Sequence, residues 1–392
     1  MKRYYQSPLS IHVVWHPDFE EGKEYAQLIY DTFCRDSSKP LSRGIGIPVF
    51  FRNKVKNDGS IQNIPFEDGE RNCIIVLIDE SFFNDTKWCT YITEITKKCD
   101  SKNRIFPLSF TEYSHFIDEA HFGKIQALRL ENIKKDEDLK TRVEERWKDI
   151  KTRLLHDCIR LMYNFSTVSD ADFEVPPPAK LFISHAKYDG ASIAIQFRDY
   201  LRAETKLASF FDVNDIADGY NFEQQIKDGA KESALVVFKT DEYSDREWCR
   251  IEVLSAKRHL SPLLVVNCIT KGEKRSFPYM GNCPTIRLNN CNFNEIINAI
   301  LRQVLHNVFQ KELMDKYESL YQQKIKKYKV IKLAQPPELF NFIDINNEAK
   351  KNPKKQILVL YPEPPLGLEE LAVLNEFDEN IKFCTPITLS QI

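Results

Sequence analysis

The segment EWCRIE, Glu247 to Glu252, places an indole and a carboxylate where they could act together on a positively charged group. It follows a strand-like run, ALVVF, and a polar stretch, KTDEYSDR, so a helix is predicted to begin there. On that helix Trp248 and Glu252 stand at positions i and i+4 and share one face. An indole face attracts a cation by about 0.5–2 kcal/mol, and an adjacent carboxylate stabilises positive charge that develops beside it.

A pyridinium ring attached to ribose, as in NAD+, suits this pair of side chains. Breaking the bond between nicotinamide and ribose passes through an oxocarbenium-like state, which needs a placed carboxylate and a stacking surface but no metal. The eight His show no H-E-x-x-H spacing and the ten Cys no C-x-x-C spacing, so no metal is predicted. No cofactor is expected either, because NAD+ would be the substrate.

Further polar residues follow two other strand-like runs. The ligands of parallel α/β sheets bind outside the carboxyl ends of the strands, so these residues should converge with the Trp–Glu pair in one crevice. The candidates after the run LFIS are Ser184, His185 and Asp189, and those after SFFD are Asp212, Asn214, Asp215 and Gly219.

The chain also contains an internal repeat. IHVVWHPDF, from Ile11, matches LFISHAKYD, from Leu181, and CIIVLIDESFFNDTKWC matches ALVVFKTDEYSDREWC. Each copy alternates β-branched runs with helix-period segments, which indicates a parallel sheet with helices on both faces. The proline-rich stretch STVSDADFEVPPPAK separates the copies. We therefore predict a domain at 1–165, a linker at 166–179, a second domain at 180–310, and a long helix with a small C-terminal α/β segment at 311–392.

Three segments of the second copy resemble the signature boxes of the Toll/interleukin-1 receptor (TIR) domain family in order and approximate spacing. They are FISHAKYD, FFDVNDIADG and SDREWCRIE, and the resemblance covers about residues 180–288. It implies a flavodoxin-like fold, and so two such α/β domains in tandem. The second copy is most similar to the NAD+-cleaving branch found in bacterial and plant immunity, whose catalytic glutamate falls on Glu252 here.

The resemblance also implies roles for the remaining candidates. Trp248 would line the nicotinamide pocket, and the strand end from Phe182 to Ser184 would face the substrate. His185 would shape its loop without acting as a base. The loop containing Asp212, Asp215 and Gly219 would cover ribose or phosphate and take part in self-association.

Each candidate has a structural alternative. Glu252 could be a solvated carboxylate paired with a neighbouring arginine, and Trp248 could be a core aromatic. Asp212 and Asp215 could cap the following helix. Cys249 has no evident base beside it, so we expect it to be packed and not a nucleophile.

The first copy lacks the proposed chemistry. Ile92 stands where the second copy has Glu252, and Glu94 would point about 200° around the helix. We expect this copy to be a degenerate TIR-like domain that serves in packing, assembly or recognition of a trigger.

The expected activity is that of an NAD+ glycohydrolase that releases nicotinamide. The resemblance implies a role in bacterial antiphage defence by NAD+ depletion, with activation through self-association or a partner protein of the defence system. Two alternatives remain open at this point. One is a cyclase that makes a cyclic ADP-ribose signal for a separate effector, and the other is a non-enzymatic adaptor.

Charge and hydropathy argue against several other classes of protein. The formal net charge of −2 disfavours a nucleic-acid groove. The N-terminal MKRYYQSPLS lacks the apolar stretch of a signal peptide, and the apolar runs are too short to cross a membrane. Unpaired cysteine spacing fits a reducing compartment, so we expect a cytoplasmic protein.

Overall fold

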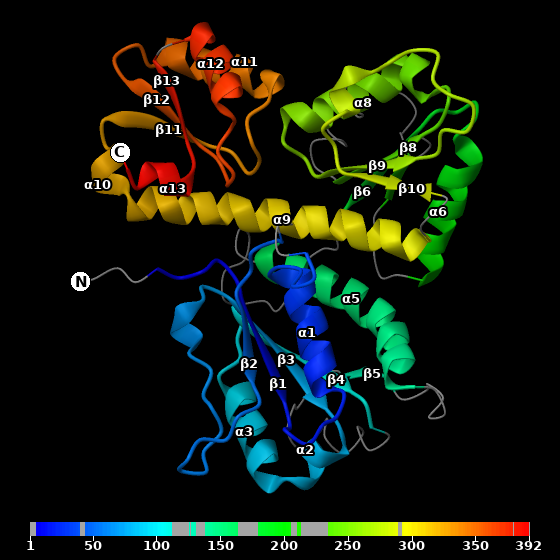
Figure 1. Cartoon of the computed structure of the whole chain (residues 1–392), viewed down its shortest axis with the longest axis vertical. Coiled ribbons are helices and arrows are strands. Elements are labelled where there is room, and N and C mark those ends of the chain that lie inside the picture. Colours follow the sequence, from blue (N-terminus) through cyan, green and yellow to red (C-terminus); the bar gives the residue numbers. More distant parts are fainter. Residues whose placement is uncertain are drawn as a thin grey trace. The chain divides into compact units, whose positions relative to one another are not determined.

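The computed structural model divides the chain into two compact units, residues 1–176 and 177–392. Three parallel sheets organise them (Figure 1). The predicted linker at 166–179 lies outside the described residues except for residue 179. The described residues are 5–39, 44–111, 125, 127–130, 138–163, 179–204, 210–212, 234–288, 292–378 and 380–391, with side chains described at all but 204, 210–212 and 377.

The first unit is built on a five-stranded parallel sheet in the order β2-β1-β3-β4-β5. Strands β1 and β3 are apolar runs buried along their whole length, as expected for a sheet covered on both faces. Alternate residues of β3 face opposite sides, because Ile74 packs with helix α3 whereas Cys73 contacts Cys158 of α5. The elements are β1 Ser10–Trp15, α1 Gly22–Phe33, β2 Val49–Arg52, η1 Phe66–Asp68, β3 Asn72–Ile78, α2 Glu80–Asn84, α3 Thr86–Lys97, β4 Asn103–Ser109, β5 Leu128–Arg129 and α5 Leu139–Tyr163.

The second unit begins with a five-stranded parallel sheet in the order β10-β9-β8-β6-β7. Val237 of β8 faces helix α8, and Phe238 packs against Phe197 of α6 on the other face. The elements are β6 Leu181–His185, α6 Ala191–Glu204, β7 Phe210–Asp212, β8 Ala234–Lys239, η4 Tyr243–Asp245, α8 Glu247–Arg258, β9 Leu263–Asn267, η5 Pro278–Met280, β10 Thr285–Arg287 and α9 Phe293–Leu320.

Both sheets have the strand order 2-1-3-4-5 when the strands are numbered within each unit, which is the flavodoxin-like order. The predicted fold class is therefore confirmed. Corresponding strands also pair in the same register, since Val14 lies beside Val76 in the first unit and Ser184 lies beside Val237 in the second. The two sequence copies thus place corresponding residues at corresponding points of their sheets.

The C-terminal residues form the third sheet, with three parallel strands in the order β11-β12-β13, as predicted for a small α/β extension. Helix α9 runs without a break through the predicted boundary at residue 310. Phe293, its first residue, packs against Phe197 of α6, whereas Met314 joins the core of the third sheet. Helix α9 therefore packs into two hydrophobic cores, that of the second sheet and that of the third. The elements are α10 Gln322–Ile325, β11 Tyr328–Lys332, α11 Leu339–Lys351, β12 Gln356–Leu360, α12 Leu368–Phe377, β13 Ile381–Cys384 and α13 Pro386–Leu389.

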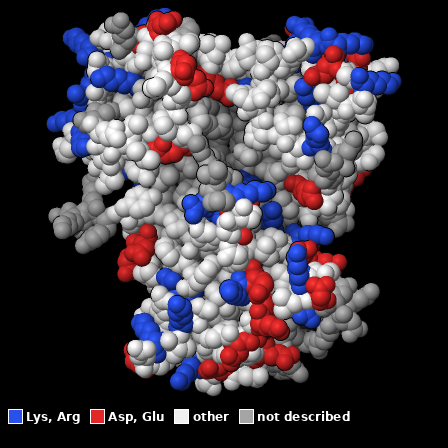
Figure 2. Space-filling model, in the orientation of Figure 1, with Lys and Arg blue, Asp and Glu red and all other residues white. Residues whose placement is uncertain are grey.

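None of the described helices combines the length and apolar character needed to span a bilayer. On the face drawn in Figure 2, Lys and Arg side chains stand among Asp and Glu side chains over each unit.

A buried lysine ties helix α8 to the C-terminal extension. Lys257, which is 7% exposed, donates to both carboxylate oxygens of Glu338 at 3.1 and 2.8 Å and to Asn282 Oδ1 at 2.6 Å. Glu338 directly precedes α11. A second pair, Arg258–Asp344 at 3.3 Å, joins the same two helices but is half exposed. Because a buried charge is tolerated only when paired, the contact with Glu338 fixes the C-terminal end of α8.

We expect Glu338→Ala to lower the free energy of unfolding of the second unit by about 1–3 kcal/mol, because it leaves the Lys257 ammonium buried with one partner fewer. Asp344→Ala is the matched control, since its ion pair is exposed and worth at most about 0.5 kcal/mol. Urea denaturation measures both. Equal effects of the two substitutions would contradict the assignment of Lys257 as the main contact.

Candidate active site

Helix α8 presents a carboxyl group to the protein interior. Glu252 is 3% exposed, so it is not the solvated carboxylate of the structural alternative. The stripe that faces the sheet follows the i, i+3, i+4, i+7 spacing of a helix packed on one side. Its members are Cys249, Glu252, Val253 and Ala256.

One hydroxyl group contacts Glu252 directly, and a second hydroxyl group contacts the first. Ser184, the fully buried penultimate residue of β6, donates from Oγ to Glu252 Oε2. The Oη of Tyr243, from η4, lies 2.5 Å from Ser184 Oγ and 3.3 Å from the carbonyl oxygen of Cys249. We call Glu252, Ser184 and Tyr243 the buried trio. It brings a strand end, a 3-10 turn and a helix together at the carboxyl edge of the sheet.

Burial determines the protonation of Glu252. Loss of solvation raises the pKa of this carboxyl to about 7, and the hydrogen bond from Ser184 acts in the opposite direction. Among the described residues, no cationic side chain is paired with Glu252. A carboxyl with a pKa near 7 can both accept and release a proton at neutral pH, as a general acid or base must.

The buried trio can satisfy both protonation states of the carboxyl. When Glu252 is ionised, Tyr243 donates to Ser184 and Ser184 donates to Glu252. When Glu252 is protonated, each donor reverses, so that Glu252 donates to Ser184, Ser184 to Tyr243, and Tyr243 to the carbonyl of Cys249. Every hydroxyl hydrogen therefore has an acceptor in either state.

The first unit has apolar residues at the corresponding positions. Val14 of β1, Phe82 of α2 and Ile92 of α3 are buried together in one hydrophobic cluster. Ile92 occupies the helix position that corresponds to Glu252, and Glu94 is exposed, as the helical geometry predicts. The fold therefore packs this place without polar groups, so the buried trio is not a requirement of the architecture.

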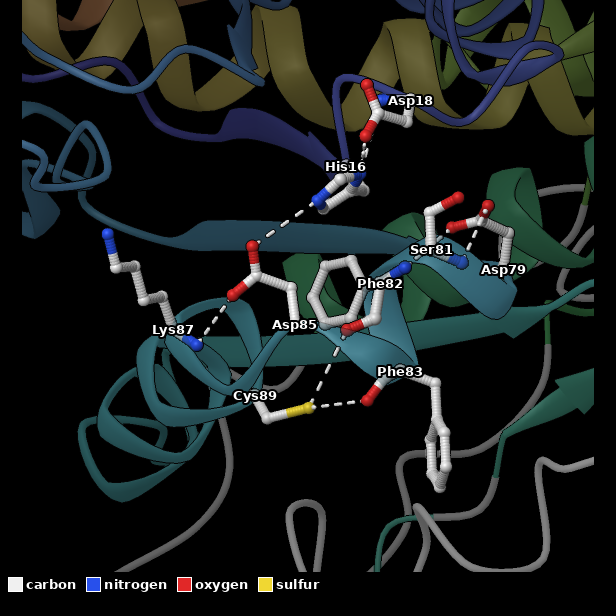
Figure 3. A network of polar contacts seen from close by, with 9 residues as sticks. All are labelled: His16, Asp18, Asp79, Ser81, Phe82, Phe83, Asp85, Lys87 and Cys89. Atoms are coloured by element: carbon white, nitrogen blue, oxygen red, sulfur yellow. Dashed lines mark hydrogen bonds and ion pairs between the residues drawn. The ribbon is translucent and has the colours of Figure 1, made fainter.

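Polar contacts at the same edge of the first unit serve to start helices. Asp79 accepts from the backbone of Ser81 at 3.1 Å to cap α2, and Asp85 accepts from the backbone of Lys87 at 2.8 Å to cap α3 (Figure 3). His16 Nε2 lies 3.6 Å from Asp85. Both carboxylates lie at helix N-termini, and neither is buried.

The two tryptophans at corresponding helix positions differ in exposure. Trp88 of the first unit is 1% exposed and packs in the core, whereas Trp248 is 42% exposed in the first turn of α8. Trp248 is thus not a core aromatic. Its indole lies on the surface one turn before Glu252, where a planar ligand could stack on it.

Two other predicted residues belong to strand β6, Phe182 and His185. The first is buried in the core, and the second contacts α8 through its backbone carbonyl. Phe182 is completely buried in the apolar cluster, so its side chain packs in the core of the domain. The carbonyl of His185 accepts from Cys249 Sγ at 3.5 Å. Burial raises the pKa of the Cys249 thiol to about 12, as expected for a packed cysteine and not for a nucleophile.

The predicted loop after β7 is described only at its start. Asp212 ends β7, where its backbone pairs with Ile183 of β6, and its side chain is not described. Asn214, Asp215 and Gly219 lie outside the described residues. Their proposed contacts with ribose or phosphate remain predictions.

Two aspartates join the other strand-end loops. Asp189 accepts from Thr240 Oγ1 at 2.7 Å and thereby links the loops after β6 and β8. Asp241 accepts from the backbone of Thr270 and of Gly272, each at 3.0 Å, and so links the loops after β8 and β9. The hydrogen bond from Gly272 is the main cause that lowers the pKa of Asp241 to about 2. Gly272 has a φ of 122°, which favours glycine in this turn.

Tyr243 was missed from the sequence, although the repeat contained a signal. The second copy has tyrosine in the DEYSDR stretch, close to the place where the first copy has Phe82. A hydroxyl added to an otherwise matching aromatic position indicates a polar partner. Within the described ranges, no three His, Cys, Asp or Glu side chains come together as a metal site.

The buried carboxyl predicts an unusual pH dependence of stability. The folded protein holds the proton of Glu252 up to about pH 7, whereas unfolded glutamates lose it near about pH 4.3. The stabilisation by Glu252 is therefore complete below the lower value and is lost as the pH rises through about 7. Relative to the parent, Glu252→Gln should gain on the order of 3 kcal/mol of stability between about pH 4 and about pH 8.

Denaturation at several pH values tests this expectation. Glu247→Gln, at an exposed position of the same helix, should follow the parent at every pH. If the curve of Glu252→Gln stays parallel to that of the parent, Glu252 ionises near its ordinary pKa and the burial argument is wrong.

Three comparisons with known proteins differ in what they find. No curated protein matches the sequence significantly. Among solved structures, one match is tagatose-6-phosphate ketose/aldose isomerase from Escherichia coli, with 12% sequence identity. The aligned region covers 79% of this chain and 83% of the isomerase chain. Its TM-score of 0.21 is too low to support an argument. Residues 181–294 match the model of the TIR domain family, so this part of the second unit is similar to a TIR domain.

Proposed function

We propose that the second unit is an NAD+ glycohydrolase, in which Glu252 assists cleavage of the bond between nicotinamide and ribose. The observation that carries this proposal is the buried carboxyl of Glu252, poised near pH 7 at the carboxyl edge of a TIR-domain sheet. The apolar counterpart in the first unit supports it, because the fold alone does not require this carboxyl.

Electrostatics favours a cationic substrate at this site. A pyridinium or an oxocarbenium ion next to a buried carboxyl lowers its pKa, so binding would convert Glu252 to the carboxylate that stabilises the cation. Ser184 then donates to the carboxylate and Tyr243 donates to Ser184. The exposed indole of Trp248 provides a stacking surface for the nicotinamide ring one helical turn away.

The proposed reaction balances with water as the second substrate. The bond from ribose C1′ to the ring nitrogen breaks, and its electron pair returns to nicotinamide and neutralises the pyridinium. A water oxygen forms a bond to C1′ while its proton passes to Glu252, which later releases it. The products are nicotinamide, ADP-ribose and a proton.

Access to Glu252 requires a local rearrangement, because its side chain is almost completely buried. We propose that self-association of the TIR domains, or binding of a partner protein, opens the site, so that the enzyme is idle as a separate chain. Depletion of NAD+ after such a trigger would fit a role in bacterial antiphage defence.

Incubation with NAD+ at low and high protein concentration, followed by chromatography of the products, tests the activity. We expect nicotinamide and ADP-ribose to form, and Glu252→Gln to reduce kcat by roughly 100- to 1000-fold through loss of a preorganised charge. Glu247→Gln is the matched control and should retain the parent rate.

Other results of the incubation with NAD+ would favour one of the alternative functions. A cyclic product would identify a cyclase. No nicotinamide at any concentration or in the presence of a partner would favour a non-enzymatic adaptor. Cleavage by Glu252→Gln at the parent rate would overturn the role of Glu252.

Trp248→Ala should raise KM for NAD+ by about 2- to 30-fold with a smaller effect on kcat, since a cation–π contact is worth about 0.5–2 kcal/mol in ground state and transition state alike. Trp248→Phe should recover part of the loss. Steady-state kinetics measures both variants, and an unchanged KM in Trp248→Ala would exclude stacking on this ring.

A further inference from the structure

The hydroxyl of Tyr243 is a polar group inside an apolar cluster. The ring is completely buried among side chains such as Phe182, Val237 and Met280. The cluster of the first unit contains Phe82 near the corresponding place and is equally buried. A phenyl ring therefore satisfies the packing, and the hydroxyl needs a separate explanation.

The turn that carries Tyr243 is held by several contacts. The backbone N–H of Tyr243 donates to the carbonyl of Thr240 at 3.2 Å. Ser244 donates to Glu273 from Oγ, and Arg250 Nη1 donates to the carbonyl of Ser244 at 2.9 Å. Glu273 is itself paired with Lys239 at 2.7 Å. These contacts fix the position from which Tyr243 Oη reaches Ser184.

We propose that Tyr243 is a positioning residue that acts through Ser184, giving the buried carboxyl of Glu252 a complete set of hydrogen bonds in both of its protonation states. Its hydroxyl accepts from Ser184 when Glu252 is protonated and donates to Ser184 when Glu252 is ionised. The catalytic consequence rests on the proposed function, but the effect on the protonation of Glu252 does not.

Loss of the tyrosine hydroxyl affects the two states unequally. With phenylalanine, the ionised carboxyl still receives the hydrogen of Ser184, and only a lone pair of Ser184 loses its partner. The protonated carboxyl, which donates to Ser184, leaves the hydrogen of Ser184 without an acceptor. An unpaired buried donor is the more costly defect, so the variant favours the ionised state and lowers the pKa of Glu252.

Loss of the serine hydroxyl has the opposite effect. Ser184→Ala removes the donor that contacts Glu252 directly, and a buried carboxylate without a donor is less stable than the neutral acid. The pKa of Glu252 should therefore rise. Opposite shifts from adjacent hydroxyls are a signature that general loosening of the core would not produce.

The other titratable groups near the buried trio are two thiols, two guanidinium groups and the imidazole of His185, which directly follows Ser184. Cys249 of α8 and Cys283, which follows η5, both have pKa values raised by burial. The positive charges of Arg246 and Arg250 lower the pKa of the Cys249 thiol, but the effect of burial is larger. Because His185 adjoins Ser184, the titration has to be followed at the carboxyl carbon of Glu252 itself and not with a probe of the whole site.

The test is a carboxyl NMR titration of the full chain with ¹³C-labelled glutamate, in which the Glu252 signal is assigned by its loss in Glu252→Gln. We expect Tyr243→Phe to lower the midpoint by about one pH unit and Ser184→Ala to raise it by at least about one unit. An unchanged midpoint in Tyr243→Phe would overturn the proposal. If Tyr243→Phe does not fold, the Ser184→Ala variant provides the test. A Glu252 midpoint in Ser184→Ala at or below that of the parent would then overturn the proposal.

Kinetics then links the proposal to activity. With an active parent, the acid limb of the pH profile of kcat/KM should move to lower pH in Tyr243→Phe by the shift that NMR reports, and a fixed limb would contradict the assigned role. A parent that releases no nicotinamide would refute the proposed function while leaving the NMR result intact.

Discussion

A carboxyl group buried against a β-sheet must be neutral or must receive hydrogen bonds, because no water is present to solvate its charge. Glu252 depends on both solutions, and the neighbouring elements supply them. The end of β6 provides Ser184, and the turn before α8 provides Tyr243. At the far end of α8, Lys257 is fixed by Glu338 of the C-terminal extension. The same helix is thus held at both ends while its middle carries a group that can change charge.

The repeated fold separates what the architecture needs from what the site adds. Both units have the same strand order and the same register at the strand that ends in the site. The first unit fills this place with Val14, Phe82 and Ile92, a packing that involves no desolvation of polar groups. Three buried polar groups in the second unit carry that cost without a benefit to the fold. The function that we propose would account for their presence, since real proteins depart from consistent packing mainly at functional sites.

Local patterns made much of this structure predictable from the sequence. Apolar runs predicted the buried strands, and the repeat predicted two similar sheets. The spacing of Trp248 and Glu252 predicted a shared helix face, but Trp248 is 42% exposed whereas Glu252 is 3% exposed. Contacts between distant residues were not accessible in this way. The hydroxyl of Tyr243 gains its meaning from Ser184, 59 residues earlier, and Lys257 pairs with a residue 81 positions away. The predicted boundary at residue 310 fell inside α9 because that helix contains no stop signal between its two cores.

Infrared difference spectroscopy between about pH 6 and about pH 8 tests the central claim, the buried and readily protonated carboxyl of Glu252, most directly. We predict a carbonyl band of a protonated carboxylic acid at the lower pH that fades at the higher pH and is missing from Glu252→Gln. Absence of that band from the parent at about pH 6 would mean that Glu252 is already ionised, and would contradict the account.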